Sequence, residues 1–306
     1  MKFSGHMPLS RILLYSMKAR QKIKSIIAGQ IAYLVPGHPD IDDIKQSSKI
    51  LFSIFTRYGD TIIDLVVIKE FVKYYPEKEY LILCPRQMKP YVSELLPTIE
   101  CIAFNKRNLF EMLKVNKLLK RRKYDIGFNP WSNGLDSDYF ISYCDKFLFY
   151  KDFDKPEIIN HYQVVKQYLK LPEKDWLINE ITLKESYQKI LICPQSTDLD
   201  RSISINKLNE LLSDLEQRYQ SSEITIAFID KEYYREGHNN FIFSKTAQSS
   251  KKFIDLVKEN ELLVCCDSAP LHIALAMNKD LMAIFRISSP DNVVKSESSL
   301  SVKFLD

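Results

Sequence analysis

Apolar and polar positions form their clearest pattern near the C-terminal end of the chain. Residues 262–266 are all apolar, which is typical of a strand buried on both faces of a parallel sheet. A polar corner follows, in which Asp267 and Ser268 are expected to supply a capping side chain and Pro270 occupies the first helical turn. The pattern predicts a strand, a tight corner and the start of a helix.

The segment after this corner continues as a short apolar helix. Asn278 is expected to end this helix, and residues 281–285 form the next apolar run, which predicts another buried strand. Amides at such a helix start, at the carboxyl end of a parallel strand, form a natural site for a diphosphate. The same pattern also fits a strand-helix-strand unit that packs a core and binds nothing.

From residue 49 onward the rest of the chain alternates between apolar runs and amphipathic segments. The further predicted strands cover residues 50–55, 80–84, 99–104, 126–129, 147–150, 189–193 and 224–229. The further predicted helices cover residues 62–75, 88–95, 109–123, 158–171, 204–219 and 253–260. This alternation predicts an α/β fold with two Rossmann-like, doubly wound halves and right-handed crossovers.

One stretch, residues 152–184, lacks the alternation and is expected to join the two halves. The predicted organisation therefore has an N-terminal extension, two α/β domains and a helical linker between them. Their boundaries are placed at residues 1–47, 48–155, 156–186 and 187–306.

Composition narrows the class of protein. The 306 residues are 45% apolar, enough for two cores, and carry a net charge of +4. So mild a charge, without an RNA or DNA motif, argues against nucleic-acid binding. The six cysteines lie mostly in apolar runs without a Cys-X-X-Cys pair, which indicates reduced core residues of a cytoplasmic protein. No apolar run approaches the roughly 20 residues that cross a bilayer.

The N-terminal extension is basic. Apolar residues recur at helical spacing over residues 8–34, and no acidic residue precedes Asp40, which predicts a basic amphipathic helix. Two placements fit this helix equally well. It lies either on an anionic membrane surface or against the protein's own core or a second subunit.

The corner at residues 267–272, DSAPLH, resembles the D-S-G-P-x-H signature of the lipopolysaccharide heptosyltransferases, glycosyltransferase family 9. Residues 50–64 resemble the opening strand and S-L-G-D loop of that family. Residues 193–205 resemble its donor-phosphate loop, and residues 244–246 its G-K-T turn. These blocks follow the order of the family, which makes the resemblance more specific than any single block.

The resemblance implies the two-domain GT-B architecture, with the acceptor in the N-terminal domain and the nucleotide-sugar donor in the C-terminal one. It implies an inverting, metal-independent transferase that moves a heptose or related sugar from a nucleotide diphosphate, foremost ADP-heptose. The acceptor would be a lipopolysaccharide core, another saccharide or a lipid-linked sugar. We expect no cofactor and no metal site, and a cytoplasmic protein that is soluble or peripheral to the inner membrane.

In the N-terminal half, Asp60 is the candidate catalytic base. Inverting transfer needs a carboxylate that takes a proton from the acceptor hydroxyl, and Asp60 matches the aspartate of the S-L-G-D loop. Gly59 permits a close backbone approach, and Arg57 is a candidate acceptor contact. Asp60 also fits an N-cap of the helix predicted from residue 62. For Asp64, one turn further on, a surface position is sufficient explanation.

In the C-terminal half, Arg201 is the candidate phosphate clamp, since a guanidinium binds two phosphate oxygens together. It falls where the family has a lysine, and Ser196 and Thr197 are expected to add hydroxyl or amide contacts. The Trp-Pro that follows in the family is replaced by residues 202–204, SIS, which leaves the register open. A solvated loop charge is the alternative for Arg201.

Three further donor-site candidates lie between residues 230 and 246. Lys245 and Thr246 match the G-K-T turn, which implies a place near the nucleotide base. Glu232 follows a predicted strand and suits a ribose or sugar hydroxyl, although a charge cluster there is more typical of a solvated loop.

The corner itself supplies the last candidates. Asp267 is expected to fix the loop or bind a sugar hydroxyl, and Ser268, Ala269 and Leu271 to offer backbone amides to the phosphates. His272 would donate to a phosphate, cap the corner or pack in the core. Ala269 replaces the usual glycine, so its methyl group could weaken donor binding.

Two other functions fit the sequence. The departures at Ala269 and at the missing Trp-Pro, together with a chain that stops soon after residue 290, suit a non-catalytic descendant that senses a sugar nucleotide or assists assembly. A transferase with a different sugar donor also fits, because family resemblance determines the type of reaction better than the substrate.

Overall fold

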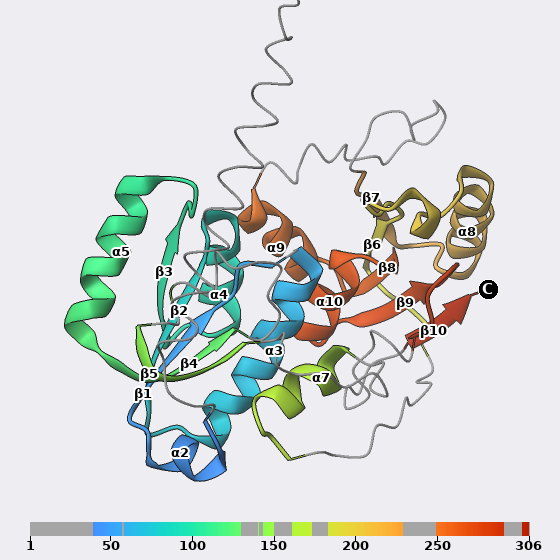
Figure 1. Cartoon of the computed structure of the whole chain (residues 1–306). Helices are drawn as coiled ribbons and strands as arrows, with labels where there is room; N and C mark the ends of the chain where they lie inside the picture. The colour runs from blue at the N-terminus through green and yellow to red at the C-terminus, as the bar shows by residue number, and fades with distance from the viewer. Residues whose placement is uncertain are drawn as a thin grey trace, which may run out of the picture.

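The computed structural model describes residues 39–56, 58–129, 140, 143–149, 161–172, 183–228, 249–290 and 302–305. Within these residues the chain forms two five-stranded sheets, one in each half of the sequence. Every strand pair in both sheets is parallel, with helices packed against the sheets (Figure 1). The predicted α/β class with two doubly wound halves is confirmed.

The first sheet has the strand order β3-β2-β1-β4-β5. Its strands are β1 (Lys49–Ser53), β2 (Glu79–Pro85), β3 (Glu100–Phe104), β4 (Tyr124–Asn129) and β5 (Cys144–Phe149). The connecting helices are α3 (Tyr58–Tyr74), the 3-10 turn η1 (Arg86–Met88), α4 (Lys89–Leu95) and α5 (Leu109–Arg122). The order reverses between β1 and β4, so the carboxyl end of β1 lies at a topological switch point, where sheets of this kind bind ligands.

The second sheet has the order β10-β9-β8-β6-β7. Its strands are β6 (Lys189–Cys193), β7 (Glu223–Ile226), β8 (Leu262–Cys266), β9 (Asp280–Ile284) and β10 (Val302–Leu305). Its helices are the 3-10 turn η3 (Leu199–Arg201), α8 (Ile205–Arg218), α9 (Ser250–Glu259) and α10 (Ala269–Ala276). Here the order reverses between the neighbouring strands β6 and β8.

A short helix, α2 (Ile41–Gln46), precedes the first sheet. It begins with a capping box, in which the amide of Asp43 donates to Asp40 at 2.8 Å and the amide of Asp40 donates to Asp43 at 2.9 Å. Its Ile44 is fully buried. The basic helix predicted over residues 8–34 lies outside the described residues.

Helix α7 (His161–Tyr168) falls within the predicted linker, and it is packed into the core. The side chains of Tyr162, Val165 and Tyr168 are fully buried. They belong to one apolar cluster that also includes residues of both sheets, α3 and α10. The two halves therefore share part of their core, with α3, α7 and α10 lying between the sheets (Figure 1).

Most predicted elements agree with the structure to within a few residues, whereas one helix begins four residues early and one strand was not predicted. The predicted strands at residues 189–193 and 262–266 match β6 and β8. Helix α3 begins at Tyr58, before the predicted start at residue 62. Strand β10, which pairs with β9, was not predicted.

The predicted end of α10 at Asn278 is confirmed. Asn278 has a φ of 53°. Its amide donates to the carbonyl of Leu275 at 3.2 Å, and the amide of Lys279 donates to that of Ala274 at 3.0 Å. This is the Schellman arrangement, in which asparagine is one of the few side chains that accept a positive φ.

All six cysteines are free thiols, five of them buried, as predicted. Among the described residues, no helix combines the length and the apolar character that crossing a membrane requires.

Candidate functional site

The helix starts that follow β1 and β8 contact each other. A Cβ added to Gly59, in the first turn of α3, would lie 3.3 Å from Cδ2 of His272 and 4.0 Å from Cα of Ala269, in the first turn of α10. No side chain of ordinary size fits there without displacing the imidazole. The absence of a side chain at Gly59 therefore lets the helix start that follows β1 pack closely against the helix start that follows β8.

Asp60 lies beside this contact. It is the residue after Gly59, in the first turn of α3, and it is half-buried. A carboxylate in this turn complements the positive end of the helix dipole. The alternative that Asp60 caps a helix starting at residue 62 is wrong, because α3 begins two residues before Asp60. The acceptor candidate Arg57 lies outside the described residues.

Asp64, one turn further along α3, is fully buried rather than on the surface. Neither of its carboxyl oxygens has a hydrogen-bond partner among the residues that the structure describes. Burial in an apolar surrounding, with a smaller contribution from the charge of Asp60, raises the pKa of Asp64 well above its usual value. Asp64 therefore stays protonated where an exposed aspartate is ionised.

The corner after β8 is held by Asp267, whose side chain is only 3% exposed. Its Oδ2 accepts a hydrogen bond from Oγ of Ser288 at 2.5 Å and lies 3.3 Å from Nη1 of Arg201. Ser268 occupies the N-cap position of α10, but its hydroxyl donates to the carbonyl of Cys266 at 3.2 Å. The expected side-chain capping is therefore wrong, since both side chains are bound elsewhere.

Arg201 ends η3, in the loop between β6 and α8. Its side chain is 41% exposed and has two carboxylate neighbours, with the buried Nε 3.4 Å from Asp198 and Nη1 3.3 Å from Asp267. The pair with Asp267 joins the loops that follow β6 and β8, on either side of the switch point of the second sheet. Its exposed part is the place where an anion could bind.

The loop that carries Arg201 is closed on itself. The amide of Ser196 donates to Oγ of Ser202 at 3.0 Å, and the amide of Ile203 donates to the carbonyl of Pro194 at 2.8 Å. Arg286, beyond β9, donates to the carbonyl of Ser202 at 2.9 Å. Ser196 is thus part of the loop scaffold, whereas Thr197 is exposed on the same loop.

The first turn of α10 offers fewer amides than the sequence suggested. The amide of Leu271 donates to the carbonyl of Ser268 at 3.0 Å, and the Leu271 side chain is fully buried. Ser268 and Ala269 are half-buried at the corner. The amide of Leu271 thus already has a backbone partner in this structure, and the phosphate-binding roles expected for Ser268, Ala269 and Leu271 stay predictions.

His272 contacts the N-terminal half and the linker helix. It is 5% exposed, its Nδ1 lies 3.3 Å from the hydroxyl of Tyr162 on α7, and its Cδ2 faces Gly59. These contacts hold the two halves together at the candidate site. Glu232, Lys245 and Thr246 lie outside the described residues.

Other contacts between the halves escaped sequence analysis because each joins segments far apart in the chain. The hydroxyl of Ser250, at the start of α9, hydrogen bonds to that of Tyr58 and donates to the carbonyl of Gln87 at 2.5 Å. The contacts of Ser288 and Arg286 described above, which lie within the C-terminal half, also had no recognisable pattern in the sequence. For Tyr58 and Ser250, only the presence of an aromatic or polar residue at a helix start hinted at a contact.

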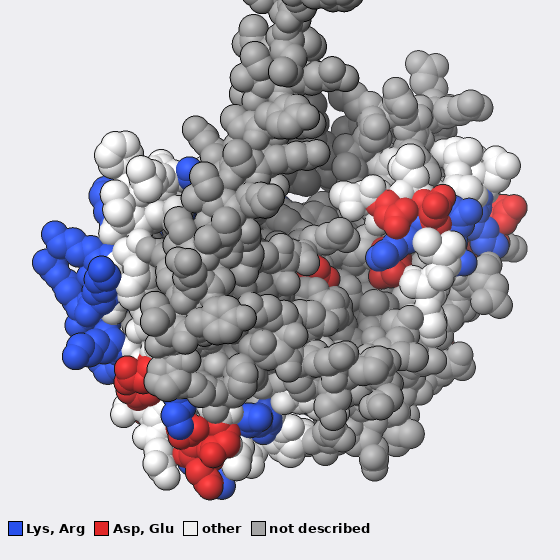
Figure 2. Space-filling model, in the orientation of Figure 1, with Lys and Arg blue, Asp and Glu red and all other residues white. Residues whose placement is uncertain are grey.

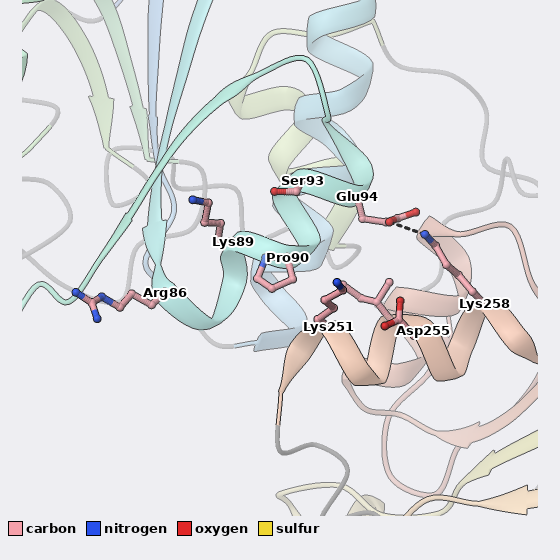
Figure 3. A pocket seen from close by; sticks show the side chains of 9 residues that line it. Arg86, Lys89, Pro90, Ser93, Glu94, Lys251, Asp255 and Lys258 are labelled. Carbon is pink, nitrogen blue, oxygen red and sulfur yellow. Dashed lines mark hydrogen bonds and ion pairs between the residues drawn. The ribbon is translucent and has the colours of Figure 1, made fainter.

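A groove of about 540 Å³ lies between α4 and α9. Charged side chains of both signs line this groove (Figure 3). Nζ of Lys258, in the C-terminal half, lies 2.6 Å from Oε2 of Glu94, in the N-terminal half. The lining residues are Arg86, Lys89, Pro90, Ser93, Glu94, Lys251, Ile254, Asp255 and Lys258. Among the described residues, no group of three or more His, Cys, Asp or Glu side chains could hold a metal ion.

The segment that contains the Asp267 corner matches a known family. Residues 245–301 match the family model described as glycosyltransferase family 9 (heptosyltransferase). The resemblance to glycosyltransferase family 9 is confirmed. The match to family 9 runs through α9, β8, the corner, α10 and β9, and therefore includes Asp267 and His272. No curated protein sequence matches the chain.

Solved structures share the fold over most of the chain. The E. coli heptosyltransferase WaaC with ADP is similar over 84% of this chain and 93% of its own, with 9% identity and a TM-score of 0.60. The E. coli ADP-heptose lps heptosyltransferase II has a TM-score of 0.59 at 15% identity, covering 84% and 90% of the two chains.

A third solved structure is the glycosyl transferase family 9 protein from Veillonella parvula. It is similar over 84% of this chain and 85% of its own, with a TM-score of 0.64 and 14% identity. Family 9 and these neighbours are glycosyltransferases, and their two-domain fold is the one predicted here.

Proposed function

We propose that this protein is an inverting, metal-independent glycosyltransferase that moves a heptose or related sugar from ADP-heptose to a lipopolysaccharide-core or other saccharide acceptor. The observation that carries the proposal is the contact between Gly59 and His272. It brings the turn that holds Asp60 to the corner that is linked to Arg201. This contact supports the proposal, because the base and the phosphate site that the reaction needs would come from opposite halves of the molecule.

In the proposed reaction, Asp60 takes the proton of the acceptor hydroxyl as the hydroxyl oxygen attacks the anomeric carbon of the donor sugar. The bond from that carbon to the phosphate oxygen breaks on the opposite face, and the nucleoside diphosphate leaves. Arg201 and the positive end of α10 stabilise the charge that develops on the diphosphate. Asp267 holds the guanidinium of Arg201 in place between the two loops.

The donor is proposed from the solved relatives. The E. coli heptosyltransferase WaaC is described with ADP and with ADP-2-deoxy-2-fluoro heptose. A nucleoside diphosphate of this kind suits a corner with a helix start and one exposed guanidinium. No metal takes part in the proposal, because Arg201 and α10 supply the positive charge.

The test combines binding and turnover on the full chain in the presence of EDTA. ADP binding is measured by calorimetry, and transfer from ADP-heptose to a saccharide acceptor by mass spectrometry. We expect Asp60→Asn to keep its ADP affinity and to lose transfer by roughly 10²- to 10⁴-fold. Asp42→Asn, on α2 with a side chain 71% exposed, is the matched control and should leave both unchanged.

The possible failures of this test are distinct. Unchanged transfer by Asp60→Asn would exclude Asp60 as the base. Wild-type protein that binds ADP but transfers no sugar would instead support the non-catalytic alternative. Activity that depends on an added divalent ion would contradict metal independence.

A further inference from the structure

Helix α5 carries a cluster of exposed apolar side chains at its N-terminal end. The side chains of Leu109, Phe110 and Leu113 are 64%, 77% and 54% exposed, whereas Val115 and Leu119 on the opposite side of the helix are buried against the first sheet. Large apolar residues grouped on a surface in this way mark a binding site for another molecule or a membrane.

The same outer side of α5 is basic along the rest of the helix. Lys114, Lys117, Lys120 and Arg121 are exposed at helical spacing from the apolar residues. Figure 2 shows Lys and Arg side chains gathered over the region of α5, at the left of the molecule. Together these residues define the α5 face, namely Leu109, Phe110, Leu113, Lys114, Lys117, Lys120 and Arg121.

The acidic residue of this helix does not offset that charge. Glu111, the one acidic residue in α5, is turned toward the protein, where its carboxylate accepts from the amide of Asn105 at 2.9 Å and lies 3.0 Å from Arg86. The guanidinium of Arg122, also on α5, pairs with Glu100 on β3 and is not counted in the face. The α5 face therefore presents cations and apolar groups together.

We propose that the α5 face docks the protein on the surface of an anionic lipid bilayer. Leucine and phenylalanine side chains enter the boundary between headgroups and acyl chains, while long Lys and Arg side chains remain among the headgroup phosphates. A negatively charged bilayer complements both features at once. The basic helix predicted over residues 8–34 lies outside the described part of the chain and does not enter this proposal.

The position of α5 relates this docking to the candidate site. Helix α5 follows the carboxyl end of β3, and β3, β2 and β1 are parallel neighbours. Neighbouring strands lie about 4.8 Å apart, so the start of α5 and the turn with Asp60 lie at the same edge of the first sheet. Docking through the apolar end of α5 would therefore turn the acceptor side toward a lipid-linked sugar, a step that rests on the proposed function.

The experiment measures binding of the full chain to vesicles of phosphatidylcholine with and without phosphatidylglycerol. We expect binding only to the anionic vesicles, and weaker binding as salt is added. The triple variant Lys117→Glu, Lys120→Glu, Arg121→Glu should weaken binding by roughly a hundredfold, since each cation contributes about fivefold. The double variant Phe110→Ser, Leu113→Ser should weaken it on the order of tenfold.

Leu199→Ser is the matched control, because Leu199 is 69% exposed on the other half of the molecule. It should bind vesicles like wild type, and all variants should keep the wild-type melting temperature. Equal binding to both kinds of vesicle, or full binding by both α5 variants, would overturn the proposal. A change of oligomeric state in these variants would do so too, because a second copy of the chain would then cover the face.

The docking proposal and the proposed function fail separately. Transfer to a soluble saccharide acceptor should be the same for the α5 variants and wild type. Loss of that soluble transfer in a variant that still folds would contradict a role confined to membrane docking.

Discussion

The corner after β1 and the corner after β8 have the same design, a buried strand, a short loop and then the start of a helix, but they are stabilised differently. At the second corner, Asp267 accepts from Ser288 and pairs with Arg201, so its buried carboxylate has partners from two other loops. At the first corner, Asp64 is buried without a hydrogen-bond partner among the described residues, and Gly59 is packed against His272. The first corner thus combines close packing with a hydrogen bond between the hydroxyls of Thr56 and Thr61, 2.7 Å apart, and leaves one buried carboxyl unpaired, whereas the second corner pairs its buried carboxylate.

This difference matters for what each corner can do. The hydrogen bond from Ser288 and the ion pair with Arg201 keep Asp267 in one arrangement, which suits the binding of a charged diphosphate. A buried and unsatisfied carboxyl is costly, and such groups are rare in proteins unless they have a function or a compensating interaction. The N-terminal corner therefore contains the costlier of the two buried carboxyl groups, and it carries the candidate base.

The largest expected effect is on stability and comes from Asp64→Asn. Below the ordinary pKa of 3.8, Asp64 is protonated in both the folded and the unfolded chain. Above that pH, Asp64 loses its proton in the unfolded chain but keeps it in the folded chain. The free energy of unfolding therefore falls by about 1.4 kcal/mol per pH unit, until the pH reaches the raised pKa of Asp64 in the folded chain. Denaturant unfolding of wild type and Asp64→Asn between about pH 4 and pH 7 measures this.

The amide side chain in the Asp64→Asn variant cannot titrate, so the free energy of unfolding of this variant should exceed that of wild type by a growing amount as the pH rises. Asp214→Asn, an exposed aspartate on α8, is the control and should follow the wild-type profile. If Asp64→Asn and wild type showed parallel profiles, Asp64 would be ionised in the folded protein and the contrast between the corners would disappear.

A somewhat smaller effect is expected at the polar corner. Arg201→Ala should weaken ADP binding on the order of 30-fold, or about 2 kcal/mol, because a charged hydrogen-bond donor is lost. Asp267→Asn should weaken it less, and the double variant should be no weaker than Arg201→Ala if Asp267 acts through the guanidinium. Calorimetry with ADP on all three variants measures this. Additive losses would show that Asp267 contacts the nucleotide independently.

Arg218→Ala provides the control for this series. Arg218 is exposed on the same half, where its guanidinium lies 5.2 Å from the ring of Tyr219. It should leave ADP affinity unchanged. A similar loss in this variant would mean that net charge, rather than the Arg201 site, determines affinity.

The packed corner is tested by Gly59→Ala, for which we expect a loss of about 1 kcal/mol in unfolding free energy. The added methyl group would meet His272 at 3.3 Å, and overpacking of this kind outweighs the better helix propensity of alanine. In a His272→Ala background the same change should become stabilising, because only the propensity gain remains. Thermal unfolding of the four proteins measures this reversal, and the same sign in both backgrounds would contradict a steric role for Gly59.

The smallest effect is expected away from both corners, at the ion pair between Lys258 and Glu94. The two side chains are 48% and 32% exposed, so Lys258→Ala should cost less than about 1 kcal/mol, and added salt should reduce this cost further. Chemical denaturation at low and high salt measures it. A large, salt-independent loss would show that the groove between α4 and α9 contributes more to the contact between the halves than the corners do.

The sequence was most informative where burial alone determines the structure. Apolar runs predicted β6 and β8 with their observed ends, and Asn278 predicted the end of α10, because a strand buried on both faces and a positive φ leave few alternatives. Helix α3 began earlier than predicted because its first turn is fixed by contact with α10, which is a tertiary interaction. The short strand β10 gave too weak a pattern to be recognised.

The candidate site was predicted only in part for the same reason. Asp60, Arg201 and the corner at residues 267–272 were identified through family motifs, and the structure shows Nη1 of Arg201 beside Asp267. Their partners Ser288, Arg286 and Tyr162 are distant in sequence and carry no motif. The wrong capping assignment of Asp267 and Ser268 arose because local propensity cannot reveal a competing partner from another loop.

The apolar cluster shared by the two sheets and α7 affects how the chain unfolds. Domains with separate cores melt independently, whereas here the loss of either half would expose Tyr162, Val165 and Tyr168 to water. The two halves should therefore melt in a single transition. Motions that admit and release substrates would then come from surface loops rather than from wide separation of the two halves.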